Sequence, residues 1–234
     1  MNEKRFWEKY FLTYDVLNEV IPYQKLMDDL IAALQLDKGS LIFDAGSGTG
    51  NLCMRLKETG TRPIGFDLCD KALEIHLTKD RDAEVFLGDM TKQLPFPDNY
   101  FDGVVSNNVL YTIDKDNRLQ VIKEFHRVLK PNGKLVIANV HTGFNPRIIF
   151  IDHLKQVKEE YSRFKIACEL LKKIFSIGKM FYYSHSLIKK HQSGKYAFMQ
   201  LDEQKQLLMQ AGFKNIADTI YTYSGQSFMD IGVK

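Results

Sequence analysis

Between residues 41 and 140, short apolar runs alternate with amphipathic stretches, and this alternation constrains the fold more than any other feature of the sequence. Each run has the length of a strand, whereas the apolar residues of the intervening stretches recur with helical spacing. The runs cover residues 41–45, 63–67, 83–87, 101–106 and 134–140. Strands that alternate with helices form a mostly parallel sheet with helices on both faces. The pattern therefore predicts a single α/β core.

The segments that flank this core add helices and two more strands. Before it, apolar residues recur at helical spacing in two stretches separated by Pro22. After it, residues 141–200 have the pattern of one or two long basic amphipathic helices. Residues 202–211 predict a helix ended by Gly212, and two final apolar runs predict antiparallel strands.

The predicted fold class is therefore α/β: a Rossmann-like, seven-stranded, mostly parallel sheet with helices on both faces and a helical cap inserted after strand 5. Three regions follow from this prediction. Residues 1–140 hold the N-terminal helices and most of the core, residues 141–200 form the cap on the acceptor side, and residues 201–234 return to the core with a helix and the final two strands.

Composition limits the class of protein. The 234 residues suffice for one buried core, and a formal net charge of +3 does not by itself indicate nucleic-acid binding. The charge is uneven, because residues 141–200 hold 11 Lys and Arg against 4 Asp and Glu. Cys53, Cys69 and Cys168 fit no metal-binding spacing and predict reduced thiols. With no signal peptide and no membrane-spanning run in the sequence, we expect a cytoplasmic protein.

The strongest local signal is DAGSGTG at residues 44–50, directly after the first predicted strand and before a helix. Glycines let the backbone turn sharply and approach a ligand closely, and the N-terminus of the following helix favours an anionic group. The spacing is G-x-G-x-G, which differs from the G-x-G-x-x-G of dinucleotide-binding proteins. A P-loop is excluded because no Gly-Lys-Ser/Thr follows.

With this segment, the order of motifs resembles that of class I S-adenosylmethionine-dependent methyltransferases, whose first motif is acid-x-G-x-G-x-G. Asp67 ends the second strand, where the family places an acid on the ribose hydroxyls, a role that suits a carboxylate acceptor. GDM at residues 88–90 follows the third strand, where the family contacts adenine, and SNNVLY at residues 106–111 follows the fourth, where it lines the methyl-donor site. The resemblance covers residues 41–140 well.

This resemblance implies S-adenosylmethionine as the cofactor and S-adenosylhomocysteine as the product. The cofactor-binding residues that it implies are Tyr14, Asp44, Gly46, Ser47, Gly48, Gly50, Asp67, Leu68, Asp89, Met90, Ser106 and Asn107.

Within the family, the pattern is most similar to small-molecule enzymes, including the ubiquinone and menaquinone C-methyltransferase-like group. FWEKYFLTYD at residues 6–15 resembles the helix that closes over the cofactor in that group, which implies that Tyr14 lies near the methionine carboxylate. The alternative is that Tyr10 and Tyr14 are core aromatics one helical turn apart. Asn107-Asn108 stands where amino-methylating enzymes have N-P-P-Y or D-P-P-Y. No cluster of metal ligands is evident in the sequence, and no metal is expected.

The predicted mechanism is direct SN2-type displacement. A sulfonium methyl group is already electrophilic, so catalysis needs mainly an aligned nucleophile and exclusion of water. A general base is needed only if the acceptor must lose a proton. His141 follows the fifth strand and is the candidate base, with a solvated loop histidine as the alternative. Tyr111 follows the fourth strand and is expected to orient the acceptor or to pack on the cofactor.

The cap is where this family commonly builds its acceptor site, and its basic and aromatic residues predict a small acceptor of acidic or amphiphilic character. Its helical pattern also fits peripheral contact with an anionic membrane that delivers a lipid-like substrate. No nucleic acid is expected, because the cap lacks Arg-rich and Gly-rich character. Two alternatives stay open: a methyltransferase acting on RNA or protein, and a non-catalytic protein that binds S-adenosylmethionine.

Overall fold

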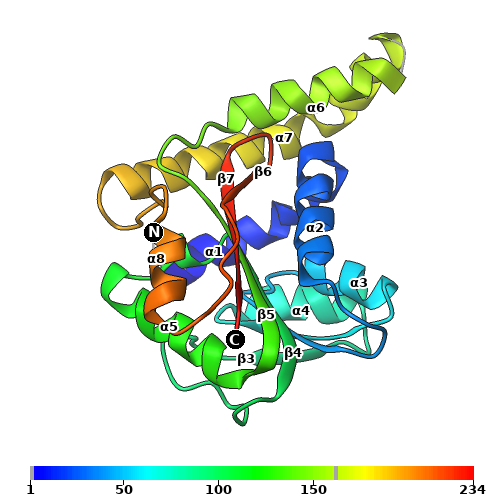
Figure 1. Cartoon of the computed structure of the whole chain (residues 1–234). Coiled ribbons are helices and arrows are strands. Elements are labelled where there is room, and N and C mark those ends of the chain that lie inside the picture. Colours follow the sequence, from blue (N-terminus) through cyan, green and yellow to red (C-terminus); the bar gives the residue numbers. More distant parts are fainter. Residues whose placement is uncertain (1–2, 161–162) are drawn as a thin grey trace.

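The structure, a computed structural model, describes residues 3–160 and 163–234, and no side chain is described for residues 159–174 or 176. The described residues form a seven-stranded sheet with the order β3-β2-β1-β4-β5-β7-β6 (Figure 1). The strands are β1 Leu41–Ala45, β2 Arg62–Asp67, β3 Glu84–Leu87, β4 Phe101–Asn107, β5 Leu129–Val140, β6 Ile220–Thr222 and β7 Ser227–Val233. The first five strands are parallel, and β7 is antiparallel to both β5 and β6. The predicted fold class is confirmed.

Helices cover both faces of the sheet. They are α1 Glu3–Tyr14, α2 Ile21–Leu34, α3 Asn51–Glu58, α4 Asp70–Lys79, α5 Lys115–Val128, α6 Pro146–Glu160, α7 Arg163–Gln192 and α8 Glu203–Gln210, with 3-10 turns η1 Asp15–Glu19 and η2 Leu110–Thr112. The faces alternate along each central strand, because Ile42 packs into the cluster that includes α2 and Phe43 into the one that includes α5. A strand that is buried on both faces reads as a continuous apolar run, as the sequence does here.

The turn expected between the fifth helix and the fifth strand is different in the structure. The sequence Pro131-Asn132-Gly133 predicts a turn that stops this helix, but α5 already ends at Val128 and β5 begins at once with Leu129. Residues 131–133 instead form an irregularity inside β5, since Phe101 pairs with Leu129 and Gly103 with Lys134. Asn132 takes a positive φ of 64° there, which asparagine tolerates better than most residues.

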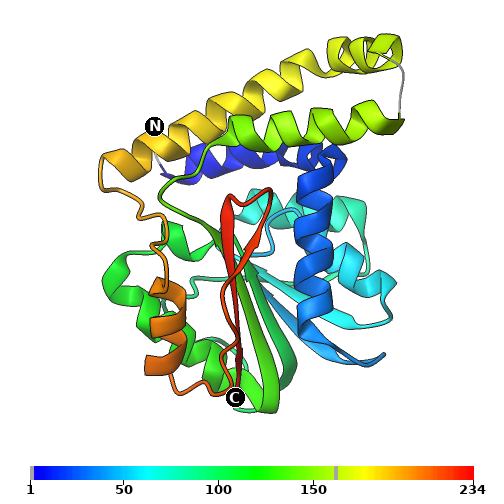
Figure 2. The same ribbon diagram turned by 45° about the horizontal axis from the view of Figure 1, so that its top comes forward.

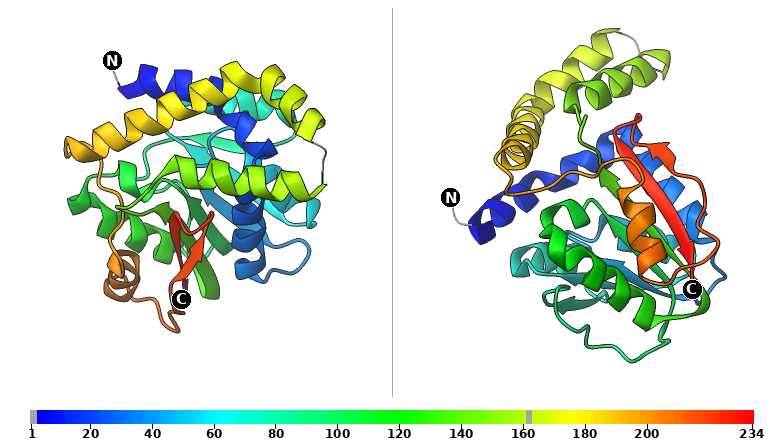
Figure 3. Two further views of the ribbon diagram at one scale, coloured as in Figure 1. Left: turned by 90° about the horizontal axis from the view of Figure 1, so that it is seen from above. Right: turned by 60° about the vertical axis from the view of Figure 1, so that its left-hand side comes forward.

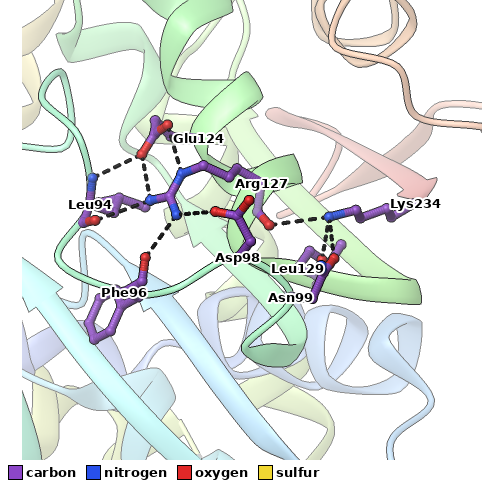
Figure 4. A network of polar contacts seen from close by, with 8 residues as sticks. All are labelled: Leu94, Phe96, Asp98, Asn99, Glu124, Arg127, Leu129 and Lys234. Atoms are coloured by element: carbon purple, nitrogen blue, oxygen red, sulfur yellow. Dashed lines mark hydrogen bonds and ion pairs between the residues drawn. The ribbon is translucent and has the colours of Figure 1, made fainter.

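A polar network closes the end of the sheet where β4 begins (Figure 4). The Arg127 guanidinium donates to Glu124 at 2.9 and 3.0 Å, to Asp98 at 2.8 Å, and to two carbonyl oxygens of the segment before β4. Lys234 Nζ donates to the carbonyl oxygens of Arg127 and Leu129. Each nitrogen of the Arg127 guanidinium therefore has an acceptor, and the contacts join α5, the β3–β4 connection and the last residue.

The opposite end of the sheet lies under the cap. Helices α6 and α7 form an antiparallel pair there, and α1 runs between this pair and the sheet (Figures 2 and 3). Phe6 and Tyr10 of α1 pack edge-on against Tyr183 of α7, with ring centroids 5.8 and 5.4 Å apart. Glu3 receives hydrogen bonds from Lys190 and Tyr196 and pairs with Lys195 at 2.6 Å. Helix α1 is thus fastened to the cap.

Several sequence expectations concern the cap and the cysteines. The sequence of the cap predicts an apolar helical stripe formed by Leu154, Val157, Tyr161, Phe164, Leu171 and Ile174. Leu154 and Val157 are partly buried, whereas the side chains of the other four lie outside the described residues, as does that of Cys168. Cys53 and Cys69 are buried and form no disulfide. No helix within residues 3–160 and 163–234 combines the length and apolar character needed to cross a membrane.

Candidate active site

A cavity of about 810 Å³ lies at the carboxyl ends of β1 to β4. Its floor consists of the loops that follow these strands, and residues of α1, α6 and α7 form its roof. The strand order reverses between β1 and β4, and an open parallel sheet has its natural ligand crevice at such a point. The expected site residues Tyr14, Asp44, Gly46, Ser47, Gly48, Asp67, Leu68, Asp89, Met90, Asn107 and Tyr111 all line it.

The glycine-rich loop forms the centre of the floor. Gly46, Gly48 and Gly50 have φ values of 83°, 53° and 79°, which side-chain-bearing residues rarely adopt. The loop is also crowded, because a Cβ on Gly46 would lie 2.2 Å from a methyl of Val109, and one on Gly48 would lie 2.8 Å from the ring of Phe11. Glycine is required here by both conformation and space.

Aspartates lie at or just beyond the carboxyl ends of the first three strands. Asp67 Oδ2 accepts from the Gly48 N–H at 2.9 Å, and its Oδ1 accepts from the Cys69 N–H at 2.8 Å. Asp89 Oδ1 accepts from both the N–H and the hydroxyl of Thr91. These bonds fix the orientation of each carboxylate and leave lone pairs for a ligand in the cavity.

Asp44 is the most deeply buried of the three carboxyl groups. Burial raises its pKa to about 7, although a hydrogen bond from the Cys53 thiol at 3.1 Å acts in the opposite direction. A carboxyl group with a pKa near 7 ionises readily when a cationic ligand group binds beside it, because the positive charge offsets the desolvation of the carboxylate. Asp44 therefore favours a ligand with a positive group close to β1.

Some polar atoms of the cavity wall lack a hydrogen-bond partner among the described residues. Ser47 Oγ and Asn107 Oδ1 are shielded from solvent and make no hydrogen bond. Buried polar atoms are nearly always satisfied in proteins, so an unpaired atom at a cavity is a sign of a ligand. A hydroxyl and an amide oxygen beside Asp44 suit a group that both donates and accepts.

Three expected site residues lie outside the lining. Gly50 caps α3, and a Cβ there would lie 2.1 Å from His76. Ser106 is fully buried, with its hydroxyl donating to the Ala45 carbonyl at 2.9 Å. His141 is engaged elsewhere, because its Nε2 donates to the Gly225 carbonyl at 2.8 Å and its Nδ1 accepts from Gly143. The structure therefore does not bring the candidate base to the cavity.

The cavity contains aromatic residues that were not among the expected site residues. Tyr10, Tyr23 and Tyr223 line it together with Tyr14 and Tyr111. Strand alternation would place the side chains of Tyr221 and Tyr223 on the same face, because they lie two residues apart. Strand β6 ends at Thr222, however, and the turn that follows directs Tyr223 differently, so that Tyr221 is 59% exposed and Tyr223 is buried. Single-strand periodicity cannot reveal that change of direction.

The end of α1 is joined to the floor. Asp15 accepts a hydrogen bond from the Thr49 hydroxyl at 2.6 Å and pairs with Lys79 Nζ at 3.0 Å. Lys79 also donates to Asn51 at 2.7 Å. With the Glu3 contacts at its beginning, α1 is held at both ends across the cavity.

Comparison with known proteins decides the family. Residues 43–137 match the methyltransferase domain model. The chain is also 27% identical over 238 residues to the demethylmenaquinone methyltransferase of Geobacillus sp. (strain WCH70), with 97% of this chain and 94% of the relative covered. The chain is a class I S-adenosylmethionine-dependent methyltransferase. S-adenosylmethionine is accordingly the cofactor of this methyltransferase.

Solved methyltransferases share the fold. One is a chain of the Haloferax volcanii complex between the Trm112 methyltransferase activator and a methyltransferase, with a TM-score of 0.67 and 16% identity over 100% of this chain and 98% of that one. Another is phosphoethanolamine N-methyltransferase 2 of Haemonchus contortus in complex with S-adenosylmethionine, with a TM-score of 0.65 and 17% identity over 97% and 57%. At these identities the likeness concerns the fold alone.

The cavity fits this cofactor on its own chemistry. S-adenosylmethionine carries an ammonium and a carboxylate at one end, two ribose hydroxyls in the middle and an adenine at the other. The ammonium and carboxylate end is matched by the buried Asp44 and by the unpaired Ser47 Oγ and Asn107 Oδ1. The ribose hydroxyls are matched by the carboxylate of Asp67. Among the described residues, no group of three or more His, Cys, Asp or Glu side chains is placed to hold a metal ion.

Proposed function

We propose that this methyltransferase transfers a methyl group to a small molecule held under α1 and the cap. The observation that carries the proposal is that the strand-end loops and the aromatic residues beneath the cap line one continuous cavity. A roofed cavity holds a small acceptor beside the cofactor and excludes competing water, whereas an RNA or a protein segment requires an open groove. RNA and protein are therefore the less favoured classes of methyl acceptor.

In this proposal the chain's own residues hold the cofactor in three parts. Asp44, Ser47 and Asn107 take the methionine end, and Asp67 takes the ribose hydroxyls with the lone pairs that its backbone bonds leave free. The adenine lies against Leu68, Asp89 and Met90, which also line the cavity. When bound, S-adenosylmethionine supplies an electrophilic methyl group for SN2-type displacement, so the chain has to align the acceptor and exclude water.

The acceptor in this proposal is an oxygenated ring compound of amphiphilic character. The Geobacillus relative is named for demethylmenaquinone, and that acceptor class suits a compartment lined by apolar and phenolic side chains. The apolar residues of this compartment are Trp7, Phe11, Phe144, Ile149, Met180, Leu187 and Phe198. No histidine stands among the lining residues of the described chain, so proton removal is left to the acceptor's own acidity and to water.

The cap also supports a proposal for substrate delivery. Phe175 and Tyr182 of α7 are 83% and 62% exposed. Lys179 lies four residues after Phe175 and three before Tyr182, and Lys189 follows Tyr182 by seven residues, which places the four side chains on one helical face. On α6, Ile151 and Lys155 are likewise exposed. Aromatic and basic side chains on one surface suit an anionic lipid layer, from which a lipid-like acceptor would enter a cytoplasmic enzyme.

The test begins with calorimetric titration of the protein by S-adenosylmethionine and S-adenosylhomocysteine. Methyl transfer is then measured by mass spectrometry with 1,4-naphthalenediol under reducing conditions and, in parallel, with total RNA. Binding of both cofactor forms and methylation of the diol are expected. Methylated RNA with an unmodified diol would replace the proposal by its alternative, and a folded protein that binds neither cofactor form would overturn it.

A further inference from the structure

Five tyrosines from different parts of the chain meet in the roofed part of the cavity. They are Tyr10 and Tyr14 of α1, Tyr23 of α2, Tyr111 of η2 and Tyr223 of the β6–β7 turn, and we call them the phenol cluster. The rings of Tyr10 and Tyr14 lie 5.2 Å apart, and those of Tyr23 and Tyr223 lie 6.1 Å apart. The Tyr23 hydroxyl donates to the Tyr14 oxygen at 3.1 Å.

The phenol cluster consists of neutral donors at physiological pH. Burial raises the pKa of all five phenols, that of Tyr23 to about 12, and neighbouring phenols raise those of Tyr14, Tyr111 and Tyr223 further. The hydroxyls of Tyr10, Tyr111 and Tyr223 make no hydrogen bond to a described residue. All three side chains line the same cavity, so their hydroxyls are available to donate to an oxygen of a ligand bound there.

The backbone that presents Tyr223 is unusual. Tyr223 and Ser224 have φ values of 55° and 57°, and a bulky residue in this left-handed region is a true outlier. Strain of this kind persists only where the surroundings hold it, and it gathers at functional sites.

Contacts on the outer side of the turn hold this conformation. The Ser224 hydroxyl donates to Asp152 of α6 at 2.6 Å, and the Asn145 N–H donates to the Gln226 side-chain oxygen at 2.8 Å. The Gly225 carbonyl accepts from Nε2 of His141. With both ring nitrogens occupied, His141 acts on the cavity only through this turn, which makes it a positioning residue for Tyr223.

We propose that the hydroxyls of Tyr10, Tyr111 and Tyr223 bind an oxygen of the acceptor that becomes negatively charged in the reaction, and that the clamped β6–β7 turn positions Tyr223 for this contact. The inference rests on the proposed function. As the acceptor atom bonds to the methyl carbon, the carbon–sulfur bond breaks, the sulfonium becomes a neutral thioether, and one acceptor proton passes to water. Preorganised donors lower the energy of the oxyanion that this proton leaves behind.

The alternative use of such a cluster is a cage for a cationic amine, in which ring faces rather than hydroxyls make the contacts. The hydroxyls decide between the two, because removing one oxygen leaves a ring face intact. Tyr223→Phe is therefore the informative variant. Tyr221→Phe is its matched control, since the same atom is removed two residues away on an exposed side chain.

The probe is 4-nitrophenol, whose absorbance reports its ionised fraction when bound, with S-adenosylhomocysteine binding measured separately by calorimetry. We expect the wild type and Tyr221→Phe to bind the probe mainly as phenolate near neutral pH. Tyr223→Phe should bind it about tenfold more weakly and with a smaller ionised fraction, the loss expected for one hydrogen bond. Its melting temperature and its affinity for S-adenosylhomocysteine should match those of the wild type.

The outcomes distinguish failure of the proposed oxygen site from failure of the proposed function. An unchanged ionised fraction in Tyr223→Phe, or no binding of the probe to the wild type, would overturn the oxygen site. Failure to bind S-adenosylhomocysteine would overturn the proposed function instead. His141→Asn should reproduce part of the Tyr223→Phe spectral change, and an unchanged spectrum there would remove its positioning role.

Discussion

The two ends of the sheet differ in how completely their polar groups are hydrogen-bonded to other protein groups. At the end where β4 begins, every nitrogen of the Arg127 guanidinium has a protein acceptor (Figure 4). At the cavity end, Ser47 Oγ and Asn107 Oδ1 lack a partner among the described residues, and the side chains of the phenol cluster line the cavity. A satisfied network stabilises the fold by itself, whereas unpaired groups contribute nothing until a ligand arrives. The difference separates residues that stabilise from residues that bind.

The largest effect on the binding end is expected from Gly48→Val. A side chain at this position meets both a φ of 53° and the ring of Phe11, so it distorts the loop that we propose to receive the methionine end of the cofactor. Calorimetry should show S-adenosylhomocysteine affinity reduced by about 100-fold or more, equivalent to roughly 3 kcal/mol. The matched control is Gly39→Val, with a φ of 84° and nothing within 4 Å. Equal loss in the control would mean that backbone strain, and not the site, is responsible.

The stabilising end is tested by Arg127→Met. Loss of the guanidinium leaves the Leu94 and Phe96 carbonyl oxygens without a donor, and it leaves Glu124 with the Leu94 N–H alone. The free energy of unfolding should fall by about 2–3 kcal/mol, with cofactor affinity unchanged. Arg62→Met removes an exposed pair with Glu84 and should cost less than about 0.5 kcal/mol. A large change in cofactor binding for Arg127→Met would erase the distinction between the two ends.

Asp67→Ala should weaken S-adenosylmethionine binding by about 1–3 kcal/mol, because hydrogen bonds to a charged acceptor are lost. Asp70→Ala, three residues further on, removes an exposed carboxylate that pairs with Lys4 and serves as the control. Both dissociation constants are read by calorimetry. An unaltered constant for Asp67→Ala would place the ribose elsewhere.

A smaller, pH-dependent effect is expected from Asp44. Its folded-state pKa of about 7 lies above the ordinary value, so the carboxyl becomes charged only as pH rises through 7. Cofactor affinity should therefore increase up to about tenfold between pH 6 and pH 8, as the ionised fraction rises. The buried protonated carboxyl also contributes stability that is fully present below the unfolded-state pKa and is lost as pH rises through the folded-state pKa of about 7. At pH 8 the buried charge destabilises the fold, so Asp44→Asn should raise the free energy of unfolding there. An identical pH profile for Asp44→Asn would assign the effect to another group.

The smallest effect concerns the outer face of the cap. Replacing Phe175 and Tyr182 by Ser should lower co-sedimentation with anionic lipid vesicles several-fold without affecting binding of S-adenosylhomocysteine. Leu201→Ser and Met209→Ser, exposed on another part of the molecule, provide the control. Vesicle binding that is equal in both double variants would leave the cap without a membrane role.

The core of the fold could be predicted because its signals are local. The predicted residues 41–45 coincide with β1, and Gly46, Gly48, Asp67 and Asp89 lie at strand ends, where a parallel sheet brings them together. The phenol cluster could not be predicted in the same way, because its members come from four separate elements that only tertiary packing brings together. His141 shows the limit of the strand-end rule: it does follow a strand, but its ring turns to the β6–β7 turn.

Helix α1 crosses the cavity and is anchored at both ends, by Glu3 to the cap and by Asp15 to the glycine-rich loop. Burial alone raises the pKa of Glu3, but hydrogen bonds from Lys190, Lys195 and Tyr196 outweigh it and lower the pKa to about 2, so this anchor keeps its charge at any physiological pH. Residues of α1 line the cavity, so a change in the position of this helix would change access to it. Each of the two anchors therefore helps to set how readily a ligand enters or leaves the cavity.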